Sequence, residues 1–292
     1  MSHKYPVKSY YKYRPLYSSG EGNPRAVHPF TESIFTKGEI YYSAPSDFND
    51  PFDCNLQMNL DGSTDEDWIN HYKRSIPTLA NGVHKQTTLE FLMNKAWQKI
   101  DPAHALADAH DVLYNQSSVF CLSKRGNSIP MFSYYADHHR GIAIEFAFDL
   151  QSIPCGLPSS HYFYKGAPYY AKIMVLDVDY PANFPDLNYH RLMRDPLYIK
   201  KLIFEKAVEW KHEEEYRIFR FKIPAGPVKF DPHLLTGVIL GCKTGQSELD
   251  LVKGWLKDWP TPVAISKAVQ AKDRFELIIE GIDSAGANTK ET

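Results

Sequence analysis

The stretch WKHEEEYRIFRF, residues 210–221, joins two sequence patterns and therefore decides how this part of the chain folds. Before the junction, residues 195–213 carry apolar side chains at helical spacing. After it, YRIFRFKI alternates between apolar and polar residues, as a strand with one buried face does. A helix over 195–212 is expected to give way to a strand that begins at Glu215. Alternation would then place Glu215, Arg217 and Phe219 on one face of that strand.

Three carboxylates in a row occupy this junction, namely Glu213, Glu214 and Glu215. Acidic side chains at the C-terminal end of a helix oppose the helix dipole, so their presence calls for a reason. A carboxylate at the mouth of a strand can face a cleft, which favours a functional role for Glu215 or Glu213. The alternative is a solvated acidic turn that pairs with Lys211 or Arg217.

Outward from the junction, helical and strand patterns are mixed without regular β-α-β alternation. Thr31 is expected to cap a short helix that Gly38 ends, and residues 62–116 are expected to be largely helical. Strands are expected at 9–14, 39–44, 118–123, from Gly141, at 169–180, 236–241, 262–269 and 275–282, with a helix at 247–259. The order predicts an α+β fold, with a single domain over 1–283, a mixed, mainly antiparallel sheet and a helical insertion at about 62–116. Residues 284–292 are expected to be a disordered tail.

The composition excludes some classes of partner. The chain has 292 residues, 43% of them hydrophobic, and a formal net charge of -2, so no broad attraction to nucleic acid or to an anionic membrane is expected. The four cysteines are widely spaced and form no CxxC pair, which argues against a thiolate zinc site. No signal peptide or membrane-spanning apolar run is recognisable, and we expect a reduced, cytoplasmic protein without a membrane partner.

A basic turn follows the strand expected at 118–123. Lys124 and Arg125 precede Gly126 and Asn127, two residues that permit backbone shapes which point N–H groups at an anion. This pattern favours binding of a phosphate-bearing ligand, although the GxxxxGK[ST] pattern of a P-loop is missing. A basic surface turn is the alternative.

Two further stretches, YYKYR (10–14) and ADHHRG (136–141), carry candidate ligand-binding residues. Alternation in the first places Tyr11 and Tyr13 on one face and the cations Lys12 and Arg14 on the other; an edge strand with charged outer positions is the alternative. Adjacent histidines in the second point apart, so a metal site is not expected there. His139 is instead expected to hydrogen-bond a backbone group or a polar ligand.

Several stretches, taken in order, resemble a bacterial family known as domain of unknown function 2971. The stretches are YKYR (11–14), SAPSDFNDPFD (43–53), FCLS (120–123), MFSYYADHHRGIAIEF (131–146) and KAVEWKHEEEYR (206–217). The family pattern has tryptophan after the methionine, where this chain has Phe132, so an aromatic residue is kept. This resemblance implies no activity.

The layout is also similar to that of DNA-modifying ADP-ribosyltransferase toxins. The corresponding stretches are YYKYR, TESIFTKGEIYYS, VFCLSKRGNSIPM, EEEYRIF and GVILG, in that order. The similarity implies NAD as the substrate and nucleic acid or protein as the acceptor, in a toxin or an anti-phage defence effector. A non-catalytic nucleotide-binding or sensing module of a defence system is the alternative function, and a purely structural partner is a third.

The toxin resemblance also implies a role for each candidate residue. Cleavage of the nicotinamide–ribose bond passes through an oxocarbenium-like state, which a nearby carboxylate stabilises. Glu215 would be the first candidate for this catalytic carboxylate and Glu213 the second. The expected NAD-binding residues are Lys124, Arg125 and Arg14 for the phosphates, Tyr13 or Tyr135 for stacking or for the ribose, and His139. Asn49 and Asp50 are expected to stabilise a turn at the cleft wall.

Overall fold

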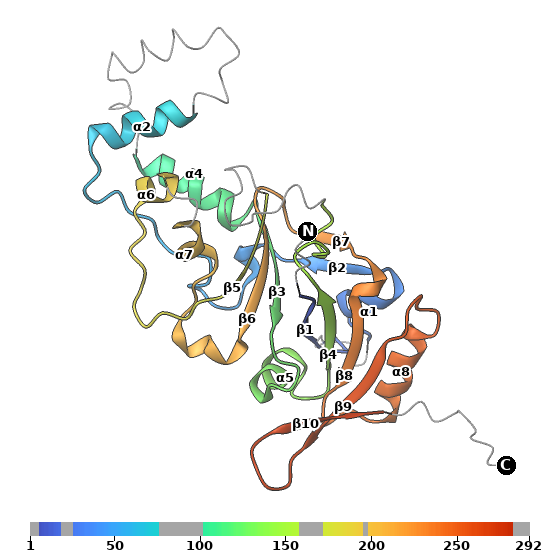
Figure 1. Ribbon diagram of the computed structural model, residues 1–292. Coiled ribbons are helices and arrows are strands. Elements are labelled where there is room, and N and C mark those ends of the chain that lie inside the picture. The colour runs from blue at the N-terminus through green and yellow to red at the C-terminus, as the bar shows by residue number, and fades with distance from the viewer. Residues whose placement is uncertain (1–5, 19–25, 76–101, 158–171, 195–197, 283–292) are drawn as a thin grey trace, which may run out of the picture.

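The structure, a computed structural model, describes residues 6–18, 26–75, 102–157, 172–194 and 198–282. Its centre is an eight-stranded sheet with the order β10-β9-β8-β4-β1-β3-β6-β5 (Figure 1). The strands are β1 (Lys8–Arg14), β3 (Ser118–Ser123), β4 (Ile142–Phe148), β5 (Ile173–Asp177), β6 (Glu215–Arg220), β8 (Leu235–Leu240), β9 (Ala264–Gln270) and β10 (Leu277–Gly281). All neighbouring strands pair antiparallel except β8 and β9, which are parallel. The expected α+β fold with a mixed, mainly antiparallel sheet is confirmed.

A second sheet and several helices surround this centre. The small sheet pairs β2 (Glu39–Tyr42) with β7 (Gly226–Lys229). The α-helices are α1 (Pro29–Thr36), α2 (Asp65–Ser75), α4 (Pro102–Tyr114), α5 (Ile129–Tyr135), α6 (Tyr189–Arg194), α7 (Ile199–Ile203) and α8 (Gln246–Leu256). Short 3-10 helices are η1 (Pro45–Asp47), η6 (Val208–Glu213) and η7 (Pro232–Leu234). Figure 1 shows α2, α4, α6 and α7 grouped beside β5 and β6, with α1 and α8 on the other side of the molecule.

The expected helical insertion is represented by α2 and α4. Residues 76–101, between these helices, lie outside the described residues, as does the tail expected at 284–292. No helix within the described ranges is both long and apolar enough to cross a membrane.

The aromatic strand β1 lies in the middle of the sheet, so the edge-strand alternative for YYKYR is wrong. It pairs with β4 along its whole length, from Lys8 opposite Phe148 to Arg14 opposite Ile142, and with β3 on its other side. Tyr13 packs edge-to-face on Phe132 of α5, with a ring-centroid distance of 4.9 Å. Residues of β1 therefore contact β3, β4 and α5.

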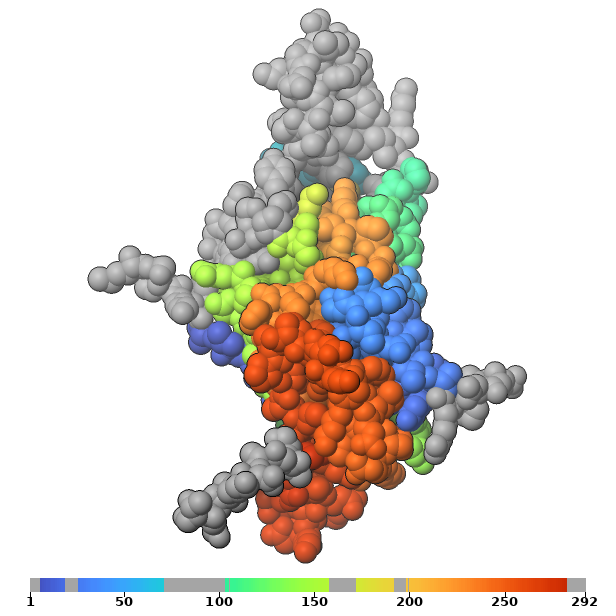
Figure 2. Space-filling model, turned by 90° about the vertical axis from the view of Figure 1, so that its right-hand side faces the viewer, coloured from blue at the N-terminus to red at the C-terminus, as the bar shows by residue number. Residues whose placement is uncertain are grey.

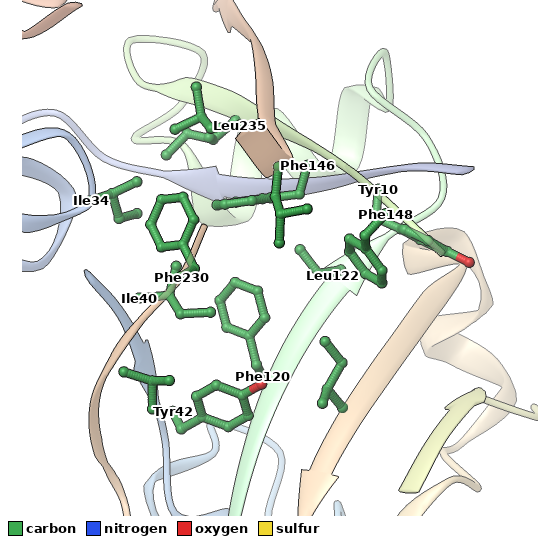
Figure 3. Close-up of a cluster of buried hydrophobic side chains, with 14 of the residues drawn as sticks. Tyr10, Ile34, Ile40, Tyr42, Phe120, Leu122, Phe146, Phe148, Phe230 and Leu235 are labelled. Carbon is green, nitrogen blue, oxygen red and sulfur yellow. The ribbon is translucent and has the colours of Figure 1, made fainter. Parts of the chain in front are cut away.

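The largest apolar core lies between the sheet, α1 and the small sheet. Figure 3 shows Phe120, Phe146 and Phe230 from three different strands or loops converging on one another. Burying side chains of this size contributes roughly 1.5–3 kcal/mol each. Phe35 of α1 stacks on Trp255 of α8 at 5.1 Å, which joins the N-terminal and C-terminal parts of the chain. Their proximity is visible in Figure 2, where blue and orange-red surfaces adjoin.

Two expected helices differ from those in the structure. The first begins at Pro29 after His28, not at Thr31, whose buried hydroxyl donates to the carbonyl of Pro15. It does end before Gly38, whose φ of +61° suits glycine.

The continuous helix expected at 195–212 is wrong over its described part. Instead, α7 ends at Ile203 and η6 begins at Val208. The backbone between them forms a bridge from Glu205 to Asp179, and the N–H of Lys206 donates to the Asp179 carbonyl at 3.0 Å. Tertiary contacts override the helical spacing here, because this break turns Lys206 into the protein interior, where it meets three carboxylates.

Candidate functional site

One end of the sheet gathers most of the residues singled out in the sequence. The pairing places Arg14 opposite Ile142 and Ile142 opposite Leu240, while Ser123 pairs with Glu215. The ends of β1, β3 and β8 therefore lie beside the starts of β4 and β6. Helix α5 covers this end of the sheet (Figure 1). Two polar features occur here: a buried cluster of charges and an open cavity.

The buried feature, called the ionic cluster below, consists of Asp53, Lys206, Glu213, Glu215 and Arg217, all with less than a tenth of their surface exposed. Arg217 is fully buried and donates to both oxygens of Glu215, at 2.8 and 2.9 Å. The same guanidinium donates to both oxygens of Asp53, at 2.8 and 2.6 Å. Glu215 and Arg217 meet because residues two apart in a strand share a face, as the sequence predicted.

Lys206 closes the other side of the ionic cluster. Its Nζ donates to Glu213 at 2.7 Å and lies 3.3 Å from Asp53 and 3.7 Å from Glu215. Burial alone would lower the pKa of Lys206, but the three carboxylates outweigh burial and raise it. Burial alone would raise the pKa of Glu215, but Arg217 and Lys206 lower it to about 2.

Glu213 is the carboxylate whose negative charge the two cations of the ionic cluster offset least. Three carboxylates face two cations, and burial followed by the charge of Glu215 raises the pKa of Glu213. Its Oε2 accepts from Lys206, and its Oε1 accepts a hydrogen bond of 2.6 Å from the hydroxyl of Tyr135. Burial and the charge of Glu213 in turn raise the pKa of Tyr135. Glu213 thus connects the ionic cluster to α5.

The three glutamates therefore have separate roles. Glu213 and Glu215 point inward, whereas Glu214 adopts a left-handed backbone with φ 44° and forms an exposed ion pair with Arg125 at 3.3 Å. The alternative of a solvated acidic turn fits Glu214 alone. The expected conflict with a helix dipole is small, because the segment before the junction is a six-residue 3-10 helix.

The open feature is a cavity of about 870 Å³ at the end of β1, called the β1 cavity below. Its lining comes from β1 and the residues that follow it, α5, the turn before β4, the loop after β8 and the start of α8. Four cations line it, namely Lys12, Arg14, Arg140 and Lys243. Within the described part of the chain, none of the four forms an ion pair with a carboxylate.

Arg14, like Lys12, is only partly exposed in this lining. Its Nε is buried without a hydrogen-bond partner among the described residues, and burial lowers the pKa of the guanidinium to about 10. Burial and the charge of Arg14 also lower the pKa of His28 on the cavity wall. Arg14 therefore stays charged at neutral pH, and a hydrogen-bond donor there is left for a ligand to satisfy.

A strained turn forms another part of the cavity wall. Asp137, His138 and His139 all have positive φ, of 43°, 51° and 72°. Each left-handed residue of this kind costs roughly 1–2 kcal/mol. The turn is held by a hydrogen bond from the N–H of Lys243 to the carbonyl of His139 at 3.0 Å. A Cβ at Gly241 would stand 2.3 Å from the same carbonyl oxygen, so this close approach requires glycine.

The structure brings only some of the sequence-predicted ligand residues together. Tyr13, Arg14 and Tyr135 line the β1 cavity. Lys124 pairs instead with Asp177 at 2.9 Å, and Arg125 pairs with Glu214. His139 points away from His138 and lines a different cavity with Ile129 and Cys242, so the two histidines diverge.

The basic turn after β3 has a structural link to β1. The hydroxyl of Tyr13 donates to the carbonyl of Arg125 at 2.7 Å and accepts from the N–H of Ser128 at 3.2 Å. Asp50 similarly holds its own turn, since its Oδ1 accepts from the N–H of Phe52 at 3.0 Å, as the sequence predicted for that residue. Asn49 interacts with the side chain of Tyr135 but is not among the residues that line the β1 cavity.

Sequence reasoning did not find Asp53, Lys206, Arg140 or Lys243. Asp53 lies in the turn-rich stretch SDFNDPFD and Arg140 directly follows the two histidines, so a local signal lies next to each of them. Lys206 was read as part of a helix, and no local pattern marks Lys243.

Comparison with protein-family models, curated proteins and solved structures finds no match to the chain. The two resemblances therefore stay predictions, and the site has to be interpreted from its own geometry. In the described ranges, no group of three or more His, Cys, Asp and Glu side chains is arranged to hold a metal ion.

Proposed function

We propose that the protein binds a nucleotide or dinucleotide, with NAD as the first candidate, in the β1 cavity. The observation that carries this proposal is the convergence of four cations without carboxylate partners on one cavity, among the described residues. A volume of about 870 Å³ lies in the range of small-molecule and cofactor sites, roughly 300–1,000 Å³.

The charges favour an anionic ligand, because the four cations outnumber the two carboxylates of the lining, those of Asp137 and Glu248. The guanidinium groups of Arg14 and Arg140 can bind phosphate through paired N–H groups, while Lys12 and Lys243 add point charges. Each charge-assisted hydrogen bond contributes about 1.5–3 kcal/mol. Tyr134, two-thirds exposed at 69%, offers a ring face at the cavity on which a base could stack.

Titration calorimetry of the whole chain tests this proposal. NAD, ADP-ribose and ATP should bind at least about tenfold more tightly than adenosine, which lacks phosphate. Arg14→Gln should weaken that binding, whereas the control Lys124→Gln, which removes an exposed cation already paired with Asp177, should leave it unchanged. Equal effects of the two substitutions, or no binding of any phosphate-bearing compound, would contradict the proposal.

A second candidate function is ADP-ribosyl transfer, and the hydrogen bond between Tyr135 and Glu213 favours it. Tyr135 lines the β1 cavity, so one hydrogen bond joins Glu213 of the ionic cluster to the cavity lining. Glu215, the first candidate from the sequence, has both oxygens engaged by Arg217. Glu213 therefore becomes the better candidate for the catalytic role.

The transfer would break the bond between nicotinamide and C1′ of the ribose. Nicotinamide leaves with the bonding electrons, and the carboxylate stabilises the positive charge that develops on the ribose. A nucleophile on nucleic acid or protein then bonds to C1′ and releases its proton to water. In a toxin or an anti-phage effector, this reaction would modify the acceptor permanently.

Incubation of the protein with NAD and a mixture of DNA, RNA and protein separates the two functions. Nicotinamide release that Glu213→Gln abolishes, with NAD affinity retained, would support transfer. NAD binding without release on any acceptor would support the non-catalytic binding module and exclude the transferase.

A further inference from the structure

A smaller cavity, of about 210 Å³, borders the ionic cluster away from the β1 cavity lining. We call it the Asp50 cavity. Three segments form it: residues 50–56, 181–185 and 205–209. Asp53 and Lys206 of the ionic cluster lie in its wall, but Arg217 and the four cations of the β1 cavity do not. It is therefore a separate site with its own chemistry.

A buried carboxylate oxygen in this wall lacks a partner. Asp50 is 6% exposed, and its Oδ1 is used by the N–H of Phe52. Its Oδ2 is buried and accepts no hydrogen bond from any described residue. A buried acceptor without a donor is unfavourable, and a ligand that supplies the donor would be stabilised there.

The charge around Asp50 favours a cation. Glu205 and Glu209 also line the cavity. Burial raises the pKa of Glu205, and the charges of Lys201 and Lys200 offset this rise only in part. Among the described residues of the lining, the one cation is Lys206, which Glu213 and Asp53 engage in the ionic cluster. A phosphate or carboxylate ligand would meet these acids and be repelled, whereas an ammonium or guanidinium group would be attracted.

The rest of the lining is apolar. Leu56, Pro181, Pro185 and Val208 provide walls that suit an alkyl chain. Phe52 and Phe184, which are 62% and 66% exposed, present their rings to solvent at the same cavity. Aromatic rings attract cations through their faces, and the attraction is modest at exposed sites. The cavity thus combines an apolar wall, two rings and an acceptor for a positive head group.

We propose that the Asp50 cavity binds an alkyl guanidine or alkyl amine, with the cationic head on Asp50 and the alkyl chain against the prolines. The volume suits one ligand the size of an amino-acid side chain and is too small for a nucleotide. The ligand can come from a free guanidine or from an arginine side chain of a peptide, since both present the same chemistry. This site is independent of nucleotide binding in the β1 cavity.

Calorimetric titration of the whole chain with agmatine tests the proposal, with butylurea as the neutral comparison. Agmatine should bind with one-to-one stoichiometry and at least about tenfold more tightly than butylurea. Asp50→Asn should weaken agmatine binding by about tenfold, and Phe184→Ala by about threefold. The control Asp258→Asn, an exposed acid outside the cavity, should change nothing.

The two ligand sources are compared with N-acetylarginine methylamide. If this compound binds more tightly than agmatine, the natural ligand is an arginine of a peptide; if agmatine binds more tightly, it is a free guanidine. Phe184→Ala removes an exposed ring and serves as the test if Asp50→Asn fails to fold. Agmatine binding that is absent, or that neither substitution weakens, would overturn the proposal whatever the result with nucleotides.

Discussion

The ionic cluster and the β1 cavity lie at the same end of the sheet but treat charge in opposite ways. In the ionic cluster, Arg217 and Lys206 are surrounded by carboxylates at hydrogen-bond distance. In the β1 cavity, Arg14 and its neighbours have no carboxylate partner among the described residues. The cations of the ionic cluster are neutralised within the protein, whereas those of the β1 cavity can be neutralised by a bound ligand.

This difference indicates a structural role for the ionic cluster and a ligand-binding role for the β1 cavity. Charges that are buried and paired fix the fold around them, because removal of one partner leaves the others uncompensated. Charges that are partly buried and unpaired reduce stability until a ligand of opposite sign arrives. The comparison therefore predicts that substitutions in the ionic cluster mainly cost stability, whereas those in the β1 cavity mainly cost affinity.

The largest effect is expected from Arg217→Met. This substitution leaves Asp53 and Glu215 buried with Lys206 as their remaining cation, and we expect unfolding free energy to fall by about 3–5 kcal/mol in urea titrations. Arg125→Met, which removes an exposed pair with Glu214, is the matched control and should cost about 0–1 kcal/mol. A loss below about 1 kcal/mol for Arg217→Met would remove the structural role assigned to the ionic cluster.

A smaller loss of stability is expected when the pH is lowered. The pKa of Glu215 is about 2 in the folded chain, below its value of about 4.3 in an unfolded one. Because the folded-state pKa is depressed, the contribution of Glu215 is present above about pH 4.3 and is lost as pH falls towards 2. Glu213 has a raised pKa, so its contribution has the opposite sign.

The difference in stability between the wild type and Glu215→Gln measures this contribution directly, since glutamine does not titrate. The difference should shrink between pH 6 and pH 3. A constant difference over this interval would mean that Glu215 is not held ionised by Arg217 and Lys206.

Much of the fold could be predicted because most strands carry a local signal. Alternation or continuous burial located β1, β3, β4, β6 and β8 close to their observed bounds, and it paired Glu215 with Arg217 on one face. The order of the strands carries no such signal. That β1, an aromatic and basic strand, lies in the centre of the sheet depends on pairing with β3 and β4, more than a hundred residues further along the chain.

The site was harder to predict for the same reason. Arg14 and Tyr135 were found because they belong to conspicuous aromatic and basic stretches. Lys206 was missed because its surroundings have helical spacing, and only contact with Asp179 and the carboxylates breaks the helix there. Local charge also misled: Lys124 and Arg125 looked available for phosphate, yet each meets an acid from a distant segment.

Arg14→Gln should show the reverse of the pattern expected for Arg217. Affinity for NAD or ADP-ribose should fall by about 10- to 100-fold, since one guanidinium contact with phosphate contributes roughly 1.5–3 kcal/mol. Unfolding free energy without ligand should stay the same or rise slightly, because a buried, unpaired charge is removed. A large loss of stability with unchanged affinity would show that Arg14 is a structural residue, and the assignment of a binding role to the β1 cavity would be wrong.

The smallest effect on stability is expected at the left-handed turn of residues 137–139, where the backbone beside the β1 cavity is strained. His138→Gly should raise the unfolding free energy by about 0.5–1 kcal/mol, because glycine adopts positive φ without a steric cost but gains freedom in the unfolded chain. Lys222→Gly is the matched control: Lys222 has φ 54° but lies outside the cavity lining. Both substitutions should stabilise the chain, whereas only His138→Gly should weaken nucleotide binding, since it loosens the turn that presents Arg140. If both left affinity unchanged, the strain at 137–139 would have no part in holding the cavity in its binding shape.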